Sequence, residues 1–199
     1  MLRSPRMLWC TTAGAVLFVV VLLVNDSVKP GYEPVRDFVS EAAIGRGGWV
    51  QIANFVVSGT LVALSSVALS NAVNRWTGRL VGFVGASLVG AGVFVTDPVP
   101  HEQATWTGAV HNVVSFVVFG CLSAACFTAA RWRPARAWRV YCRVTGIAVP
   151  ALFVASGASA GTGGLFQRAT IVVGWSWLAV LGLRAVRGRP TATGAEVRE

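Results

Sequence analysis

Six long apolar runs constrain the fold of this chain more than any other feature. An α-helix of roughly 16 to 25 residues, rising ~1.5 Å per residue, crosses the ~30 Å hydrocarbon core of a bilayer. Hydrophobic residues make up 54% of the 199 residues and charged residues 13%, which is too apolar for a soluble domain. The sequence therefore predicts an all-α polytopic membrane bundle of six transmembrane helices, although a buried hairpin among the shorter runs would lower that count. The predicted spans are Leu8–Val24, Trp49–Val73, Leu80–Val95, Thr107–Ala130, Tyr141–Ala160 and Ala169–Val186.

The spans follow one another closely, so we expect one domain over residues 1–190. A short, disordered cytoplasmic tail is expected over 191–199. The first run follows Arg3 and Arg6 in the manner of a signal peptide, but no small-x-small cleavage site comes after it. We therefore expect it to be retained as the first transmembrane helix.

The basic residues predict the orientation of the bundle. On a six-helix path, 13 of the 17 Lys and Arg fall on one side, whereas six of the eight carboxylates fall on the other. The positive-inside rule then predicts a protein of the cell membrane with both termini on the cytoplasmic side. The same distribution explains the net charge of +9 without a nucleic-acid partner, because no aromatic-interleaved basic surface accompanies it. Membrane lipids are the expected partners, and the basic clusters are expected to contact anionic headgroups.

The first outward loop contains apolar residues at helical spacing, from Val35 to Ala42. This pattern predicts a short amphipathic helix lying on the membrane surface. Its polar face would present Ser40 together with Asp37 and Glu41. The two carboxylates stand at i and i+4, where like charges repel, so a cationic group is expected between them.

The other outward loops hold the remaining groups capable of chemistry. Asp97 and His101 lie in the third loop, and His111 lies one turn inside the fourth span. An ionisable residue inside a span is a functional candidate by default, although a hydrogen bond from His111 to a neighbouring helix is an equally weighted alternative. Asp97, His101 and His111 have the right types for zinc ligands, but their spacing matches no specific metal motif.

Arg168 lies at the start of the last span, on the side that is poor in basic residues. Such a position is best explained if the guanidinium pairs with a carboxylate, and the candidates are Asp97, Asp37 and Glu41. We take this pairing as structural in preference to ligand binding.

Small residues and one proline predict how the spans pack. Gly82, Ala86 and Gly90 form a small-xxx-small stripe in the third span, with Gly85 and Gly92 beside it, which indicates a packing face. Pro150 is expected to kink the fifth span and open space beside it, where Ser156 and Ser159 either satisfy freed backbone groups or line the opening.

Five blocks of residues are specific as a set, although each would be weak alone. They are residues 30–41 (PGYEPVRDFVSE), 47–51 (GGWVQ) with Asn54 and Phe55, 94–98 (FVTDP), Gly108 with His111, and 164–168 (GLFQR) with Trp175. With these blocks the chain resembles bacterial membrane proteins of the domain of unknown function 998 family, and the resemblance covers nearly the whole chain. The resemblance implies a six-helix membrane protein and no assigned activity. The family pattern often has His where Thr107 stands and an acidic residue where Gln167 stands, so this member is altered or specialised if the site needs those groups.

Two classes of function fit these residues. The first is a membrane-embedded enzyme of hydrolase or cyclase type acting on a lipophilic substrate, with His111 as general base or metal ligand, Asp97 orienting it, and Ser40 as a weaker candidate nucleophile. The second is a non-catalytic transporter, lipid-binding or accessory protein. No cofactor and no oligomeric state follow from the sequence. Convergence of His111, Asp97, Asp37 or Glu41, and Arg168 around a cavity would favour the enzyme, whereas a scattered set would rule out this catalytic arrangement.

Overall fold

A computed structural model describes residues 5–99 and 104–188 of the chain. Within these residues it contains helices and no strand, and six helical stretches are long and apolar enough to cross a membrane. The predicted six spans are thereby confirmed, while the predicted tail over 191–199 lies outside the described residues. The helices are α1 (Leu8–Val28), α2 (Gly48–Leu64), α3 (Ser66–Ala72), α4 (Arg75–Val93), α5 (Trp106–Ala129), α6 (Arg136–Ala158) and α7 (Gly163–Arg187), with two short 3₁₀ helices, η1 (Pro5–Met7) and η2 (Val39–Ala43). Helices α2 and α3 together make one span, interrupted at Ser65.

Most helices extend beyond the apolar runs that predicted them. Helices α4, α6 and α7 begin five or six residues before the predicted starts at Leu80, Tyr141 and Ala169. The added turns of α4 and α6 contain arginines, whose long side chains reach out of the hydrocarbon while their backbone stays helical. The added part of α7 contains Arg168, which is buried. Helix α1 likewise continues through Asn25 and Asp26 to Val28.

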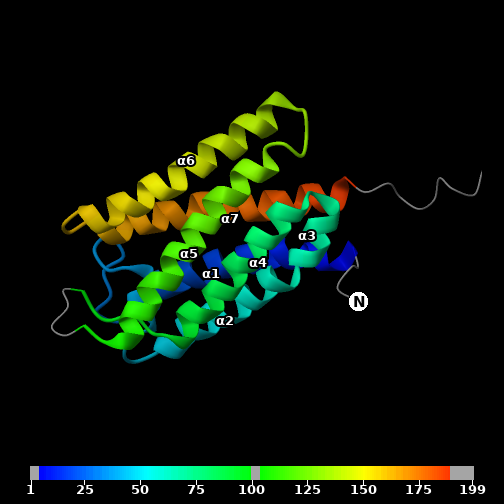
Figure 1. Ribbon diagram of the computed structural model, residues 1–199. Helices are drawn as coiled ribbons and strands as arrows, with labels where there is room; N and C mark the ends of the chain where they lie inside the picture. Colours follow the sequence, from blue (N-terminus) through cyan, green and yellow to red (C-terminus); the bar gives the residue numbers. More distant parts are fainter. Residues whose placement is uncertain (1–4, 100–103, 189–199) are drawn as a thin grey trace, which may run out of the picture.

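The six spans form a closed ring. Each span packs against the next one along the chain, and the contact between α1 and α7 closes the circle. The described ends of the chain lie at one end of the bundle, on the right in Figure 1, which we call the terminal end. The opposite end, which we call the distal end, carries the long segment 29–47 and the connections between α4 and α5 and between α6 and α7.

Aromatic side chains fill the middle of the ring. The ring of Phe18 in α1 lies 5.0 Å from that of Trp175 in α7 and 5.5 Å from that of Phe55 in α2. Phe119 in α5 lies 6.2 Å from Trp175. All four side chains are buried. The centre of the ring is therefore packed with side chains.

Glycines bring α2 and α4 into close contact, as small residues do in membranes. A Cβ atom on Gly85 would lie 2.6 Å from the carbonyl oxygen of Gly59, and one on Gly92 would lie 2.9 Å from Cβ of Phe55. The predicted stripe packs only in part: Ala86 is exposed, whereas a Cβ atom on Gly82 would lie 3.0 Å from Ser66 and one on Gly90 would lie 3.4 Å from Val114. The closest contacts with α2 lie on the adjacent face, which carries Gly85 and Gly92.

The segment 29–47 does not contain the predicted amphipathic helix. Its only regular element is η2, which packs against α2 and α7 and buries Val39, Ala42 and Ala43. Val35, which was expected on the apolar face, is 52% exposed. The helical turn begins only at Val39, because Phe38 is its N-cap residue and donates its backbone N–H to the Glu41 side chain at 2.7 Å.

Helix α6 remains helical through Pro150. Proline has no N–H to donate to the carbonyl four residues earlier, which belongs to Gly146. The hydroxyl of Ser123 in α5 donates to that carbonyl at 2.6 Å instead. A neighbouring helix thus satisfies the group that Pro150 leaves free.

Candidate functional site

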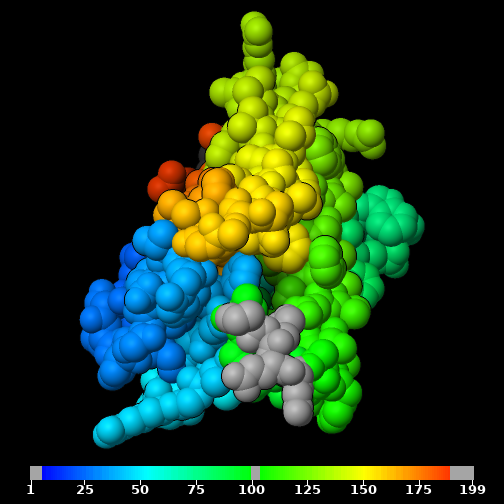
Figure 2. All heavy atoms as spheres, turned by 90° about the vertical axis from the view of Figure 1, so that its left-hand side faces the viewer, coloured from blue at the N-terminus to red at the C-terminus, as the bar shows by residue number. Residues whose placement is uncertain are grey.

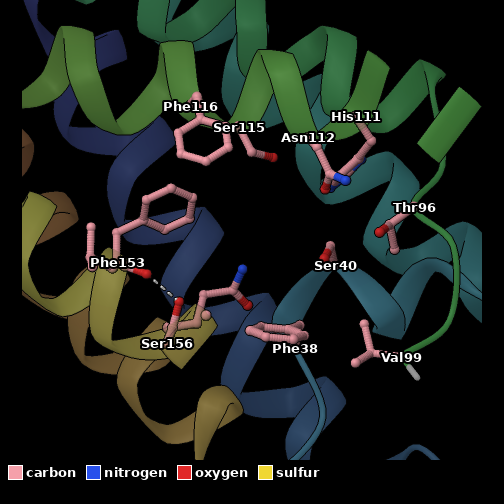
Figure 3. Close-up of a pocket in the computed structure, with 13 residues that line it drawn as sticks. Phe38, Ser40, Thr96, Val99, His111, Asn112, Ser115, Phe116, Phe153 and Ser156 are labelled. Atoms are coloured by element: carbon pink, nitrogen blue, oxygen red, sulfur yellow. Dashed lines mark hydrogen bonds between the residues drawn. The ribbon is translucent and has the colours of Figure 1, made fainter. Parts of the chain in front are cut away.

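A cavity of about 380 Å³ opens at the distal end between α5 and α6. Its walls come from these two helices, from segment 29–47, from the connection that follows α4, and from the beginning of α7. Figure 3 draws its lining residues as sticks, and they are Phe38, Ser40, Thr96, Val99, His111, Asn112, Ser115, Phe116, Phe153, Val154, Ser156, Gly157 and Gln167.

A smaller space of about 30 Å³ adjoins this cavity. The two spaces share Ser40, His111, Ser115 and Gln167, and the smaller one reaches the aromatic centre of the bundle at Trp175. The indole N–H of Trp175 is buried and has no hydrogen-bond partner in the described chain. The cavity therefore leads from the distal end toward the core.

His111 is held in one orientation by the end of α4. Its Nδ1 lies 2.7 Å from the carbonyl oxygen of Phe94 and 3.1 Å from that of Ala91. Both oxygens can only accept, so Nδ1 carries the proton and satisfies carbonyls that the helix terminus leaves free. In the neutral imidazole, Nε2 then bears a lone pair, and it has no partner among the described residues. His111 thus has both the predicted structural bond and an available basic nitrogen.

Several polar groups beside His111 also lack intramolecular partners. Within the described chain, the hydroxyls of Ser40 and Ser115 and the amide of Asn112 make no hydrogen bond, although all three residues line the cavity. Gln167 accepts a hydrogen bond from the backbone N–H of Val39 at 2.6 Å through Oε1, which leaves its amide N–H groups for another acceptor. The cavity is therefore able to hydrogen-bond a polar ligand group.

The other side of the cavity carries two phenylalanines, and Ser156 beside them donates its hydroxyl to the carbonyl of Phe153 at 2.6 Å. In Figure 3, Phe116 and Phe153 lie together, apart from Ser40 and Thr96 on the opposite side. The rings of Phe116 and Phe153 meet edge to face at 5.3 Å. Phe116 is 65% exposed and Val154 is 66% exposed on the outer surface of the bundle. The cavity mouth is thus bordered by residues that face the surroundings of α5 and α6.

Asp97 stabilises the start of α5 and does not line the cavity. Its carboxylate accepts from the hydroxyl of Thr105 at 2.6 Å and from the backbone N–H of Thr105 at 2.9 Å. Thr105 in turn caps the N-terminus of α5 by accepting from the N–H of Gly108. A carboxylate near a helix N-terminus also interacts favourably with the helix dipole. The orienting bonds of His111 come from backbone carbonyls and not from Asp97. Of the residues whose convergence would favour an enzyme, only His111 lines the cavity.

Asp37 and Glu41 act on different parts of segment 29–47. The Asp37 carboxylate accepts from the backbone N–H of Glu33 at 2.8 Å and contacts the guanidinium of Arg36 at 3.1 Å. Oε1 of Glu41 accepts from the backbone N–H of Val99 at 2.8 Å, which joins this segment to the connection after α4. The two carboxylates therefore have separate backbone donors, and the cation predicted to lie between them is not seen in the described chain.

Arg168 fastens segment 29–47 to α7, as the contact of the two segments in Figure 2 illustrates. Its carboxylate partner is Asp26, which was not among the three predicted candidates: Nη2 lies 2.7 Å and Nε 2.9 Å from the two carboxylate oxygens. The other N–H groups donate to the carbonyls of Asp37 and Gly164 and to the hydroxyl of Tyr32. All five donors of Arg168 are thus used. Burial raises the pKa of Tyr32, against the opposing effect of the Arg168 charge.

The candidate metal ligands do not form a site in the described chain. No group of three His, Cys, Asp or Glu side chains that could hold a metal ion occurs among residues 5–99 and 104–188. His101, one of the three candidates, lies outside the described residues. Asp97 and His111 have the separate backbone partners described above.

A buried polar ladder between α1 and α2 was not predicted. Gln51 accepts from Asn25 at 3.0 Å and from Asn54 at 3.4 Å, and Ser58 donates to Asn54 at 3.1 Å. The spacing 51, 54, 58 places these side chains on one helix face and was the available signal. The ladder does not reach the cavity, and it stabilises the contact of the two helices.

Of three comparisons with known proteins, one identifies a family for this chain. No curated protein and no solved structure matches it. The family described as "Protein of unknown function (DUF998)" matches residues 12–184, which include all the cavity residues. The match confirms the resemblance seen in the sequence. This multi-pass, all-helical membrane protein therefore belongs to the DUF998 family.

Proposed function

We propose that this protein binds a membrane amphiphile in the cavity between α5 and α6. The observation that carries the proposal is the division of one cavity into a polar side with unpaired donors and acceptors and an apolar side that opens at the bundle surface. The polar group of the ligand would lie near Ser40, His111 and Gln167. Its hydrocarbon part would lie against Phe116 and Phe153.

The size and surroundings of the cavity support this class of ligand. A volume of about 380 Å³ lies within the range of ~300–1,000 Å³ typical of small-molecule sites. A membrane-spanning bundle meets lipid along its outer surface, so a mouth between exposed Phe116 and Val154 is accessible from the bilayer. With both termini in the cytoplasm, as the charges predict, the ligand would enter from the outer leaflet.

A photoactivatable lysophospholipid with a diazirine in its acyl chain tests this proposal. The purified protein, in nanodiscs of phosphatidylcholine, is irradiated with the probe, and the labelled peptides are mapped by mass spectrometry. We expect labelling of α5 and α6 near Phe116 and Phe153. The variant Gly157→Phe should reduce it severalfold, because Gly157 lines the cavity and a Cβ there meets nothing within 4 Å.

Ala158→Phe provides the matched control. Ala158 is the next residue of α6, is also exposed, and does not line the cavity. Labelling should therefore remain at the wild-type level in this variant. Equal labelling of both variants, or labels spread evenly over all six spans, would show that the probe only samples the lipid surface.

Hydrolysis of an ester of such a ligand is a second candidate function. It is favoured by one observation, namely that the Ser40 hydroxyl and the basic Nε2 of His111 belong to the same cavity. In this reaction the Ser40 oxygen attacks the carbonyl carbon while its proton passes to His111, which then protonates the leaving alcohol. Water, activated in the same way, releases the acyl group and restores Ser40.

A fluorophosphonate probe separates the two candidates. A hydrolase should be labelled at Ser40, and the label should disappear in Ser40→Ala and in His111→Gln. Binding without hydrolysis predicts that the lysophospholipid probe labels the wild-type cavity whereas fluorophosphonate does not react with Ser40.

A further inference from the structure

We infer that the terminal end of the bundle contains a separate binding site for the phosphate group of an anionic phospholipid. The site is a cavity of about 450 Å³ lined by Arg131, Arg133, Arg139 and Arg143, together with Phe127. It lies where the connection between α5 and α6 turns back, at the opposite end of the bundle from the distal cavity (Figure 1).

The four guanidinium groups lack anionic partners. None of them forms a salt bridge or a hydrogen bond within residues 5–99 and 104–188. All five carboxylates of the described chain belong to α1 near its distal end, to segment 29–47 or to the connection after α4. Arg168 shows the contrast, since each of its N–H groups has an acceptor. The arginines of the terminal cavity thus have unused donors for a ligand.

Arg133 is positioned in advance of any ligand. Its guanidinium stacks on the ring of Trp132 at 4.3 Å, and its Nε is shielded from solvent without a hydrogen-bond partner. The terminal N–H groups of Arg133 make no hydrogen bond within the described chain, and an anionic oxygen is the acceptor best suited to a cation. Stacking also limits the freedom of the side chain before binding.

The start of α6 favours an anion for a further reason. Arg139 and Arg143 stand at i and i+4, where like charges repel. The first turn of α6 contains no acidic residue, and the helix has no side-chain N-cap. The positive end of the helix dipole therefore adds to the arginine charges, and both effects become favourable when a phosphate binds.

Apolar neighbours distinguish a lipid from free phosphate. Ile147 continues the helix face of Arg139 and Arg143 by one turn and is 62% exposed. Phe127, 43% exposed, lies beside α6 at the level of Gly146, where a Cβ would approach its ring to 3.0 Å. A lipid with its phosphate at the arginines would therefore place its acyl chain along Phe127 and Ile147.

The test compares two double variants with the same loss of charge. Native mass spectrometry of the detergent-solubilised protein measures binding of phosphatidylglycerol and phosphatidylcholine. Wild type should prefer phosphatidylglycerol, and Arg139→Gln/Arg143→Gln should bind it roughly thirty-fold more weakly. Arg75→Gln/Arg79→Gln should retain wild-type binding, because these arginines also stand at i and i+4 at the terminal end but stack on Trp76, outside the cavity.

Each remaining outcome would overturn the inference. Equal losses in the two double variants would indicate a general surface-charge effect. Competition by millimolar inorganic phosphate equal to that by phosphatidylglycerol would identify an anion site without lipid specificity. Equal binding of the two lipids to wild type would show that no phosphate-selective site exists. The lysophospholipid labelling of the distal cavity should not change in Arg139→Gln/Arg143→Gln, so failure of this site and failure of the proposed function are distinguishable.

Discussion

Replacing Arg168 with methionine should be among the most destabilising single changes in this protein. The variant removes a cation whose side chain is 11% exposed and leaves the Asp26 carboxylate, 15% exposed, without its partner. It also removes the donors to the carbonyls of Asp37 and Gly164. Breaking a buried pair from one side costs about 3–5 kcal/mol. For a chain of this size, a loss of that magnitude lowers the unfolding midpoint by on the order of 10 °C.

Thermal unfolding in a mild detergent, followed by circular dichroism, measures the loss. The double variant Asp26→Leu/Arg168→Met removes both charges, so it should be more stable than Arg168→Met alone by at least ~1 kcal/mol. Arg36→Gln is the control, because the exposed Arg36 side chain pairs with Glu33 and Asp37 at the surface, and its loss should change the midpoint little. The reasoning is refuted if Arg168→Met unfolds at the same temperature as Arg36→Gln.

Three further predictions concern the loop, the proline and the glycines. Burial raises the pKa of Tyr32, so the contribution of this residue to stability is fully present below pH ~10 and is lost as the pH rises further. In a pH series, the unfolding midpoint of Tyr32→Phe should therefore fall less at alkaline pH than that of the wild type. Ser123→Ala should lower the free energy of unfolding by about 1–2 kcal/mol, because it leaves the Gly146 carbonyl unpaired. The same change should cost little in a Pro150→Ala background, which restores the missing N–H. A double-mutant cycle that shows no coupling between the two changes would contradict the assignment. Gly85→Ala should separate α2 from α4 and lower the unfolding midpoint, whereas Gly120→Ala, where a Cβ meets nothing within 4 Å, should leave it unchanged or raised.

The sequence predicted the spans well because a bilayer imposes a minimum apolar length on every helix. It predicted the helix ends less well, since hydropathy stops at the first charged residue whereas backbone hydrogen bonds continue. This error had one important consequence. A first span that ends at Val24 places Asp26 in a loop, and the pattern then gives no reason to pair it with Arg168. In the structure Asp26 belongs to the last turns of α1 and forms that ion pair.

The cavity was only partly predictable. His111 was identified because ionisable residues are rare in spans, and Ser115 follows it at i+4 on the same helix face. The contributions of Phe153, Gly157 and Gln167 depend on which helices are neighbours, and no pattern within a single span contains that information. The glycine stripe shows the same limit: two faces of α4 carry small residues, and only the position of α2 determines which one packs.

Arg168 also connects the structural part of the distal end to the cavity. Its bond to the carbonyl of Asp37 holds the chain just before η2, and the preceding residue of α7, Gln167, accepts from the N–H of Val39. Ser40 follows directly and lines the cavity. The position of Ser40 relative to His111 therefore depends on a buried ion pair that does not itself line the cavity. Arg168→Met should consequently reduce lysophospholipid labelling even at temperatures where the six helices remain folded, because loosening η2 displaces the polar wall of the cavity.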